Sequence, residues 1–236
     1  TGGVNFFNPG SQVFERFINS PNNKNSLSDN AVLAMHADKE GNYWIGTRSG
    51  GVDKLDYNKK SFTNYSHNPS NPNSLINNSV LVITEDKAGV LWLGTFSSGM
   101  NSFDPNTNTF RRFVNNPSDP NSLSDNRVYS IIEDSEGIIW IGTYGGGLNR
   151  LDKSTGKFKV FKHDEKNTSS ISSNSVWSMA EDNDGLLWLG TFGGGVNIFD
   201  RTKQTFTNFK NDPKDPSSLG DDNIILVFND RSEERR

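Results

Sequence analysis

Residues 122–147 read SLSDNRVYSIIEDSEGIIWIGTYGGG, and the pattern of this stretch recurs along the chain. A second clear copy, SSNSVWSMAEDNDGLLWLGTFGGG, occupies residues 172–195. The period is 48 residues, and no insertion interrupts it. A fixed period of a few tens of residues is the signature of a repeat architecture. Four residue types keep this step in every copy: Gly41, Gly89, Gly137 and Gly185; Trp44, Trp92, Trp140 and Trp188; Thr47, Thr95, Thr143 and Thr191; Asp56, Asp104, Asp152 and Asp200.

One period contains four short runs of β-branched and aromatic residues, separated by turns that carry Gly. In the third copy we predict strand A at Val128 to Glu133, strand B at Ile138 to Thr143, strand C at Leu148 to Asp152 and strand D at Phe158 to Lys162. Short runs without helical periodicity indicate strands. Four strands per period make one propeller blade. The sequence therefore predicts an all-β fold: a β-propeller of four-stranded antiparallel blades, with strand A innermost and essentially no helix.

The repeat also predicts how residues 1–230 divide within the propeller. The expected parts are strands C and D of a partial blade in 1–18, full blades in 27–66, 75–114, 123–162 and 171–210, strand A of the last blade in 219–230, and a charged C-terminal tail in 231–236. The chain starts inside a repeat without an initiator Met, so we interpret it as a piece of a longer protein. If it closes alone, its terminal strands complete a fifth blade. Otherwise it is a fragment of a larger ring, whose open blade edges favour self-association.

The invariant positions have structural explanations. Asp134 opens the turn between strands A and B, and Gly137 supplies the positive φ that closes it. Trp140 follows three residues later and is expected to fill the space between neighbouring blades. A loop rich in Pro and Asn leads from each strand D to the next strand A. One apolar residue is expected to anchor each loop: Leu27, Leu75, Leu123, Ile171 and Leu219.

Composition excludes several classes of function. The 236 residues carry 24 Lys and Arg against 28 Asp and Glu, a net charge of −4, so no basic field favours nucleic acid or an anionic membrane. No apolar run is long enough to span a membrane, so we expect no direct membrane contact in this chain. The absence of Cys excludes disulfides and thiolate metal sites. We predict no cofactor and no metal.

Catalytic groupings are weak in this sequence. His67 and His163 share one repeated position, which indicates a structural role, and His36 has no evident nucleophile partner. Most acidic residues recur with the repeat, whereas an active site needs different carboxylates that converge once. The turn at Asp182 lacks the closing Glu of a calcium loop. We therefore expect no enzymatic activity, and a propeller lyase or glycosidase is the alternative.

Binding residues are expected where the repeat varies, because the constant positions build the blades. The residue after strand B is Arg48, Phe96, Tyr144 or Phe192, and each precedes a turn rich in Gly or Ser. Aromatic rings stack on sugars, and Arg binds hydroxyls or carboxylates. Two strand A positions vary as well, and Arg127, Tyr129 and Trp177 are their least repeat-like members. We predict that these seven residues bind a small ligand such as an oligosaccharide; the alternative is that the rings pack on adjacent blades.

The pattern NSLSDN-x-V-x-x-I-x-E-D-x-x-G-x-x-W-I-G-T-x-x-G-G resembles the two-component regulator propeller repeat of bacterial sensor proteins, and the resemblance covers essentially the whole chain. It implies the sensing region of a hybrid two-component histidine kinase, often one that detects polysaccharide breakdown products. It also implies a position on the periplasmic or extracellular side of a bacterial inner-membrane protein, with kinase activity in parts not present here. A structural propeller that docks proteins is the second alternative.

Overall fold

The computed structural model describes residues 2–230, whose strands fall into two compact units. Unit 1 is Thr1–Arg112 and unit 2 is Phe113–Arg236. The predicted charged tail, 231–236, lies outside the described residues. Every regular element from residue 2 to residue 230 is a strand, and this part of the chain has no helix long and apolar enough to cross a membrane.

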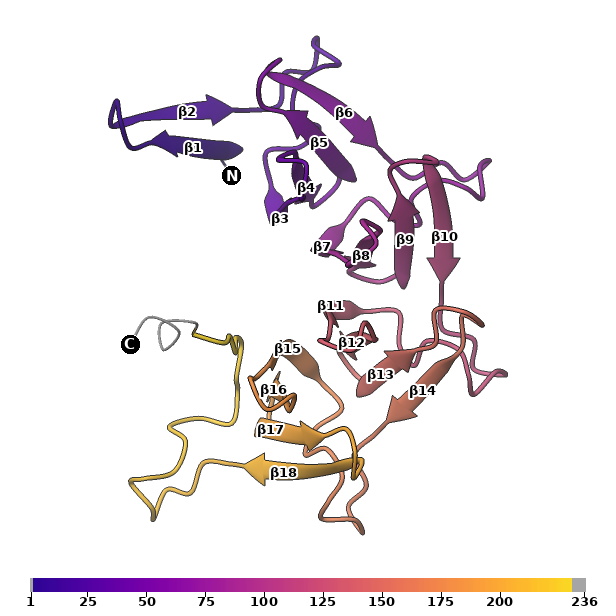
Figure 1. The fold of residues 1–236 in the computed structure, drawn as a ribbon, viewed down its shortest axis with the longest axis vertical. Coiled ribbons are helices and arrows are strands. Elements are labelled where there is room, and N and C mark those ends of the chain that lie inside the picture. The colour runs from indigo at the N-terminus through magenta and orange to yellow at the C-terminus, as the bar shows by residue number, and fades with distance from the viewer. Residues whose placement is uncertain (1, 231–236) are drawn as a thin grey trace. The chain divides into compact units, whose positions relative to one another are not determined.

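Unit 1 contains a two-stranded sheet and two four-stranded sheets (Figure 1). The strands are β1 (Val4–Asn8) and β2 (Val13–Phe17); then β3 (Val32–Ala37), β4 (Tyr43–Thr47), β5 (Val52–Asp56) and β6 (Ser61–Tyr65); then β7 (Val80–Glu85), β8 (Leu91–Thr95), β9 (Met100–Asp104) and β10 (Thr109–Phe113), which ends at the boundary. β1 and β2 correspond to the predicted partial blade, and the other two sheets lie within the predicted full blades.

Unit 2 contains two more four-stranded sheets of the same order. Their strands are β11 (Val128–Glu133), β12 (Ile139–Thr143), β13 (Leu148–Leu151) and β14 (Phe158–Phe161), followed by β15 (Val176–Glu181), β16 (Leu187–Thr191), β17 (Gly195–Asp200) and β18 (Thr205–Phe209). In each sheet the strands pair in chain order, each antiparallel to the next. The all-β propeller-blade prediction is confirmed.

First strands pack together within each unit: β3 lies beside β7, and β11 lies beside β15 (Figure 1). The fourth strand forms the opposite edge of each sheet. Each first strand also carries a β-bulge near its start, where the register with the second strand shifts, as between Val128 and Ser130. A bulge inserts one residue that no partner opposes and re-aims its side chain. The same irregularity occurs in all four four-stranded blades of residues 2–230, so each has one residue without a cross-strand partner at the equivalent position of its first strand.

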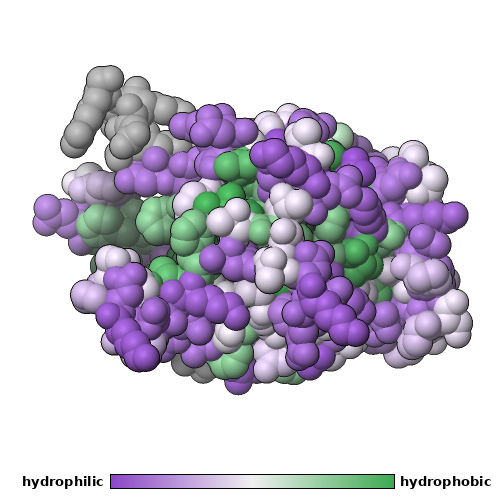
Figure 2. All heavy atoms as spheres, turned by 90° about the horizontal axis from the view of Figure 1, so that it is seen from below, coloured by the Kyte–Doolittle hydropathy of each residue, from purple (hydrophilic) through white to green (hydrophobic). Residues whose placement is uncertain are grey.

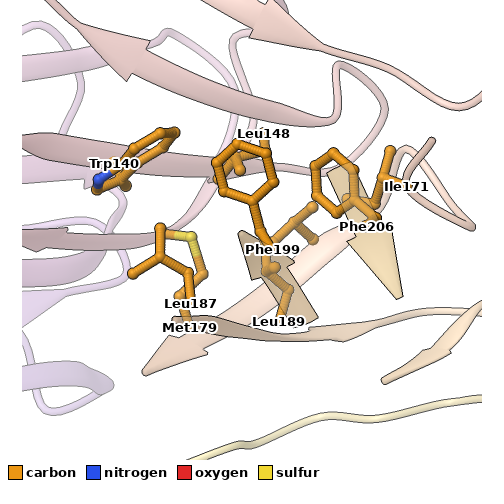
Figure 3. Packing of buried hydrophobic residues seen from close by; sticks show 9 residues of the cluster. Trp140, Leu148, Ile171, Met179, Leu187, Leu189, Phe199 and Phe206 are labelled. Atoms are coloured by element: carbon orange, nitrogen blue, oxygen red, sulfur yellow. The ribbon is translucent and has the colours of Figure 1, made fainter. Parts of the chain in front are cut away.

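The repeated Trp joins one blade to the next. In unit 2, Trp140 of β12 packs with Met179, Leu187 and Phe199 of the following blade (Figure 3). Trp44 makes the equivalent packing in unit 1. A blade exposes too much apolar surface to be stable alone, and burying a ring of this size stabilises by about 2 to 3 kcal/mol. This arrangement confirms the role predicted for Trp in both units.

The turn before this Trp is held by the repeated Asp. Asp134 accepts hydrogen bonds from the Glu136 and Ile138 amides through Oδ1, and from Trp140 Nε1 at 2.7 Å through Oδ2. Gly137 has a φ of 82°, the left-handed value predicted for it. The same Asp to Trp bond is present in the other three blades. One side chain therefore fixes the turn and orients the ring that joins the blades.

The loop anchors behave as expected with one exception. Leu27, Leu75, Leu123 and Ile171 are fully buried, whereas Leu219 is partly exposed. The face drawn in Figure 2 is mainly hydrophilic, with hydrophobic side chains visible in patches between polar ones.

Residues 219–230, predicted as an inner strand, carry no strand. The segment nevertheless follows the last blade: the Ile224 amide donates to the Thr191 carbonyl at 2.9 Å and the Val227 amide donates to Ser178 Oγ at 3.0 Å. A strand is defined by a ladder of paired residues, and 219–230 form no such ladder within residues 2–230. The strand prediction is therefore not met within the described residues, and ring closure and self-association stay predictions.

Candidate functional site

Backbone hydrogen bonds bring the variable positions together in every blade. The residue after the second strand donates its amide to the carbonyl of the residue before the first strand. The four bonds are Arg48 to Ala31 at 2.9 Å, Phe96 to Ser79 at 3.1 Å, Tyr144 to Arg127 at 3.0 Å and Phe192 to Ser175 at 2.9 Å. The third variable position is the bulge residue itself: Leu33, Leu81, Tyr129 and Trp177. The fold thus places three variable side chains at one end of each blade.

In unit 2 these positions form a continuous set of rings, which we call the aromatic row: Tyr129, Tyr144, Trp177 and Phe192. Tyr129 lies 5.6 Å from Tyr144 between ring centroids and 5.4 Å from Trp177. Trp177 stacks on Phe192 at 5.2 Å with an interplanar angle of 15°. No ring contact joins Tyr129 and Phe192 among residues 2–230, so Trp177 is the ring that links them. Each such pair contributes about 0.5 to 1.5 kcal/mol beyond burial.

The row is only partly available to a ligand. Tyr129, Tyr144 and Trp177 are half-buried against one another, whereas Phe192 is 45% exposed. The indole N–H of Trp177 is buried and has no hydrogen-bond partner in the described structure. A buried donor without an acceptor costs about 1 to 3 kcal/mol, and such costs tend to persist where function requires them. The exposed ring of Phe192 is the part of the row that can stack directly on a ligand.

Arg127 supplies the polar end of the aromatic row. Its guanidinium donates to both carboxylate oxygens of Asp125, at 3.0 and 2.7 Å, and its Cζ lies 4.7 Å from the centre of the Tyr144 ring. Burial raises the pKa of Asp125, but the hydrogen bonds from Arg127 outweigh it, and the pKa is lowered. The carboxylate is therefore charged at neutral pH. This end of the row presents an oriented ion pair beside a ring, which suits hydroxyl groups.

Unit 1 places its two predicted residues in a different setting. Arg48 is exposed, and Phe96 is 52% exposed and makes no ring contact among the described residues. The bulge residues of this unit are Leu33 and Leu81, which supply no π-face. The structure therefore brings together five of the seven predicted residues within unit 2 and leaves Arg48 and Phe96 without an aromatic neighbour.

The three histidines have identifiable partners. Nδ1 of His67 lies 2.9 Å from the Leu75 carbonyl, and Nδ1 of His163 lies 2.8 Å from the Ile171 carbonyl, so both rings hold the loop between blades. Nε2 of His36 lies 3.5 Å from a carboxylate oxygen of Glu85. Residues 2–230 contain no group of three His, Cys, Asp or Glu arranged to hold a metal ion.

Some participants were missed by sequence reasoning. Asp125, which orients Arg127, sits at a position that is Asp29, Asn77 and Ser173 in the other blades, and this variation was the available signal. Gly145 leaves room for the ion pair: a Cβ there would lie 3.1 Å from Arg127 Nη2. The mutual stacking of the rings could not be read from spacing, because it depends on the bulge.

The comparisons with known proteins agree with this architecture. A family profile for the two component regulator propeller matches residues 26–49, 74–97, 122–145 and 170–193. Each match runs from the loop before a first strand to the residues just after the second, which is the part of the blade that carries the site. The repeats of this chain are two-component regulator propeller repeats, and the resemblance inferred from the sequence is confirmed. A search of curated proteins finds no match.

Solved structures give the same fold. The chain is 26% identical, with a TM-score of 0.74, to the extracellular domain of the hybrid two component system BT3049 from B. thetaiotaomicron, over 89% of this chain and 28% of that one. It is 24% identical, with a TM-score of 0.65, to the extracellular domain of the one component system BT4673 from the same organism, over 92% and 29%.

A third solved structure is an enzyme. Virginiamycin B lyase from Staphylococcus aureus is 16% identical, with a TM-score of 0.64, over 89% of this chain and 63% of that one. This likeness, like that to BT4673, shows the fold alone. The chain spans less than a third of each of the two extracellular domains, from BT3049 and BT4673.

Proposed function

We propose that this chain is part of an extracytoplasmic ligand-sensing propeller, and that an oligosaccharide binds at the aromatic row of unit 2. The observation that carries the proposal is the row itself: the four rings occupy positions where the repeat varies, so blade construction does not require them. The likeness to the extracellular domain of BT3049 supports sensing on the outer side of a bacterial membrane.

The chemistry of the row suits a saccharide. A sugar ring has a C–H face that stacks on an aromatic ring and hydroxyls that hydrogen-bond to charged groups. Phe192 offers the exposed ring, and the Arg127 to Asp125 pair offers donors and acceptors at the other end. A short oligomer that reaches both ends gains from each contact, whereas one contact alone binds weakly.

The test is a panel of neutral oligosaccharides titrated by calorimetry against the parent chain, Phe192→Ala and Tyr144→Ala. We expect at least one glycan to bind, and Phe192→Ala to weaken it about fivefold, because one exposed stacking contact is lost. Phe209→Ala is the matched control, since Phe209 is equally exposed in the same unit and lies outside the row. If both row variants fold by thermal melt and bind as tightly as the parent, the row is not the site.

The same titrations test the enzymatic alternative when products are analysed. His36 beside Glu85 is the acid and base pair available to a lyase or glycosidase in unit 1. Turnover that disappears in His36→Ala would favour the enzyme, and binding without turnover favours the sensor.

A further inference from the structure

A second site candidate lies in unit 2, over β13, β14 and the turn that joins them. A depression of about 460 Å³ is lined by Arg150, Lys153, Lys157 and Lys159. A neighbouring depression of about 210 Å³ shares Arg150 and Lys159 and adds Arg201. We call the larger one the basic depression. It is cationic in a chain whose net charge is −4.

The repeat does not require these cations. At the positions of Arg150 and Lys159, the other three blades carry Lys54 and Thr63, Ser102 and Arg111, and Ile198 and Thr207. At the position of Lys157 they carry Ser61, Thr109 and Thr205. Each of the other blades thus has at most one cation among these three positions, whereas this blade has three.

Arg150 and Lys159 are also cross-strand partners: they face each other in the β13 to β14 register. Like charges directly opposite in an antiparallel pair destabilise the sheet. The pairing is therefore locally unfavourable in the free protein, and an anion placed between the two side chains would relieve it.

Internal acids do not neutralise the whole group. Glu133 pairs with Lys153 at 2.8 Å, and Lys159 contacts the neutral Gln204. Arg150 and Lys157 make no ion pair within residues 2–230. Asp152 also lines the depression and is charged at neutral pH, because hydrogen bonds from Ser154 and Thr155 lower its pKa to about 2. It offsets one of the four positive charges in the lining.

Apolar residues line the basic depression as well: Ile138, Leu151 and Phe158. An apolar lining with a few polar groups is the usual composition of a small-molecule site.

We propose that the basic depression binds a small ligand that carries two or more oxyanion groups, held by Arg150, Lys157 and Lys159. Carboxylate, sulfate and phosphate oxygens share the geometry that guanidinium and ammonium groups recognise. The site is distinct from the aromatic row and does not depend on it.

Three anionic probes test the proposal by calorimetry at low salt: trigalacturonate, sucrose octasulfate and tripolyphosphate, with maltotriose as the neutral comparison. The decisive variant is Arg150→Ser with Lys159→Thr, which uses residues that other blades carry at these positions. We expect at least one anion to bind and the double variant to weaken it about tenfold or more, because two charge-assisted contacts are lost. Lys157→Thr provides a second, single variant on the same principle.

The control is Lys166→Ser with Lys214→Ser, which removes the same charge from exposed loop positions. The site is supported if the Arg150→Ser with Lys159→Thr variant loses anion affinity and the loop control, which has the same net charge, does not. The probe that binds best identifies the type of oxyanion. Phe192→Ala should leave this binding unchanged, so the row and the basic depression can fail separately. The proposal is overturned if no anion binds, or if the double variant and the control lose affinity equally.

Discussion

The two units share one blade geometry and differ at the end of the blade where the bulge lies. In unit 1 the bulge residues are Leu33 and Leu81, and the Phe96 ring stands alone. In unit 2 the equivalent positions hold Tyr129 and Trp177, and their rings stack into a row. Backbone hydrogen bonds at this end are the same in both units. The repeat therefore sets the backbone, and a few side chains decide whether the rings at a blade end stand alone or stack on one another.

The largest effect on stability is expected at an ion-pair cluster that joins the two blades of unit 2. Arg201 bridges Asp134 at 2.5 Å and Glu181 at 3.0 Å, and its unit 1 counterparts are Tyr57 and Pro105. Arg201→Ala should destabilise unit 2 by about 2 kcal/mol, because Asp134 is buried and loses one of its donors. Hydrogen exchange followed by mass spectrometry would locate the loss in β11 to β18 and leave β3 to β9 unchanged.

This effect depends on pH. Burial raises the pKa of Asp134, but hydrogen bonds from Trp140, the Ile138 amide and Arg201 outweigh it, so the pKa is lowered. The bridge therefore stabilises fully above the ordinary Asp pKa and weakens as the pH falls through the lowered value. The difference in the free energy of unfolding between the parent and Arg201→Ala should therefore become smaller as the pH is lowered. Lys203→Ala removes an exposed pair with Asp200 and should give no measurable change; an equal loss there would argue against the bridge.

The aromatic row gives the next effect. Trp177→Leu installs the residue type that unit 1 carries at Leu81, so the blade should still fold. Trp177 is the ring that contacts both Tyr129 and Phe192, so its loss disturbs both at once, and glycan affinity should fall about tenfold, about 1.4 kcal/mol. Calorimetry measures the affinity, and Leu81→Ile is the control at the matching position of unit 1. Unchanged affinity in Trp177→Leu would mean that the rings serve packing alone.

A smaller effect, of opposite sign, is expected in unit 1. Asp53 is fully buried, and its pKa is raised because burial disfavours the charge. Its counterparts are Asn101, Asn149 and Asn197, which are neutral. Asp53→Asn should stabilise unit 1 at pH 7 by about 1 kcal/mol, the scale of desolvating one buried polar group.

The pH dependence of this variant has a definite sign. A carboxyl with a raised pKa in the folded state loses stability as pH rises from its unfolded pKa through its folded one. The gain in stability of Asp53→Asn over the parent should therefore be smaller in acid, where Asp53 is protonated and neutral. Thermal melts across pH measure it. An advantage that is the same at every pH would point to a hydrogen-bonding effect involving Ser28 and Asn64, the present partners of Asp53.

The smallest expected effect is in unit 1, where removing the Phe96 ring should leave glycan affinity nearly unchanged. Phe96→Ala removes an exposed ring that contacts no other ring in residues 2–230. We expect glycan affinity to stay within twofold of the parent, less than about 0.4 kcal/mol. A large loss would mean that the plain end of unit 1 also contacts the ligand.

Sequence reasoning succeeded wherever a residue repeats. The spacing of Trp140 and Gly137 was enough to predict the blades, the turn and the packing between blades, because these features need the same residue each time. It predicted Tyr129 and Trp177 as exceptions but not their stacking, since the bulge that directs them leaves no mark in the pattern. Arg201 and the cations of the basic depression stand at positions where the repeat varies, so periodicity carries no signal for their contacts. The strand expected in 219–230 has no paired partner among residues 2–230.

The bulge gives each blade one residue that does not follow the alternation of side chains between the two faces of the sheet. A residue there has no cross-strand partner, so exchanging Leu for Tyr or Trp alters no pairing register and leaves the core unchanged. Recognition can therefore diverge by single substitutions while the scaffold is copied intact. In evolutionary terms, a duplicated repeat arrives with a stable frame and with positions, the bulge among them, that can change without altering that frame.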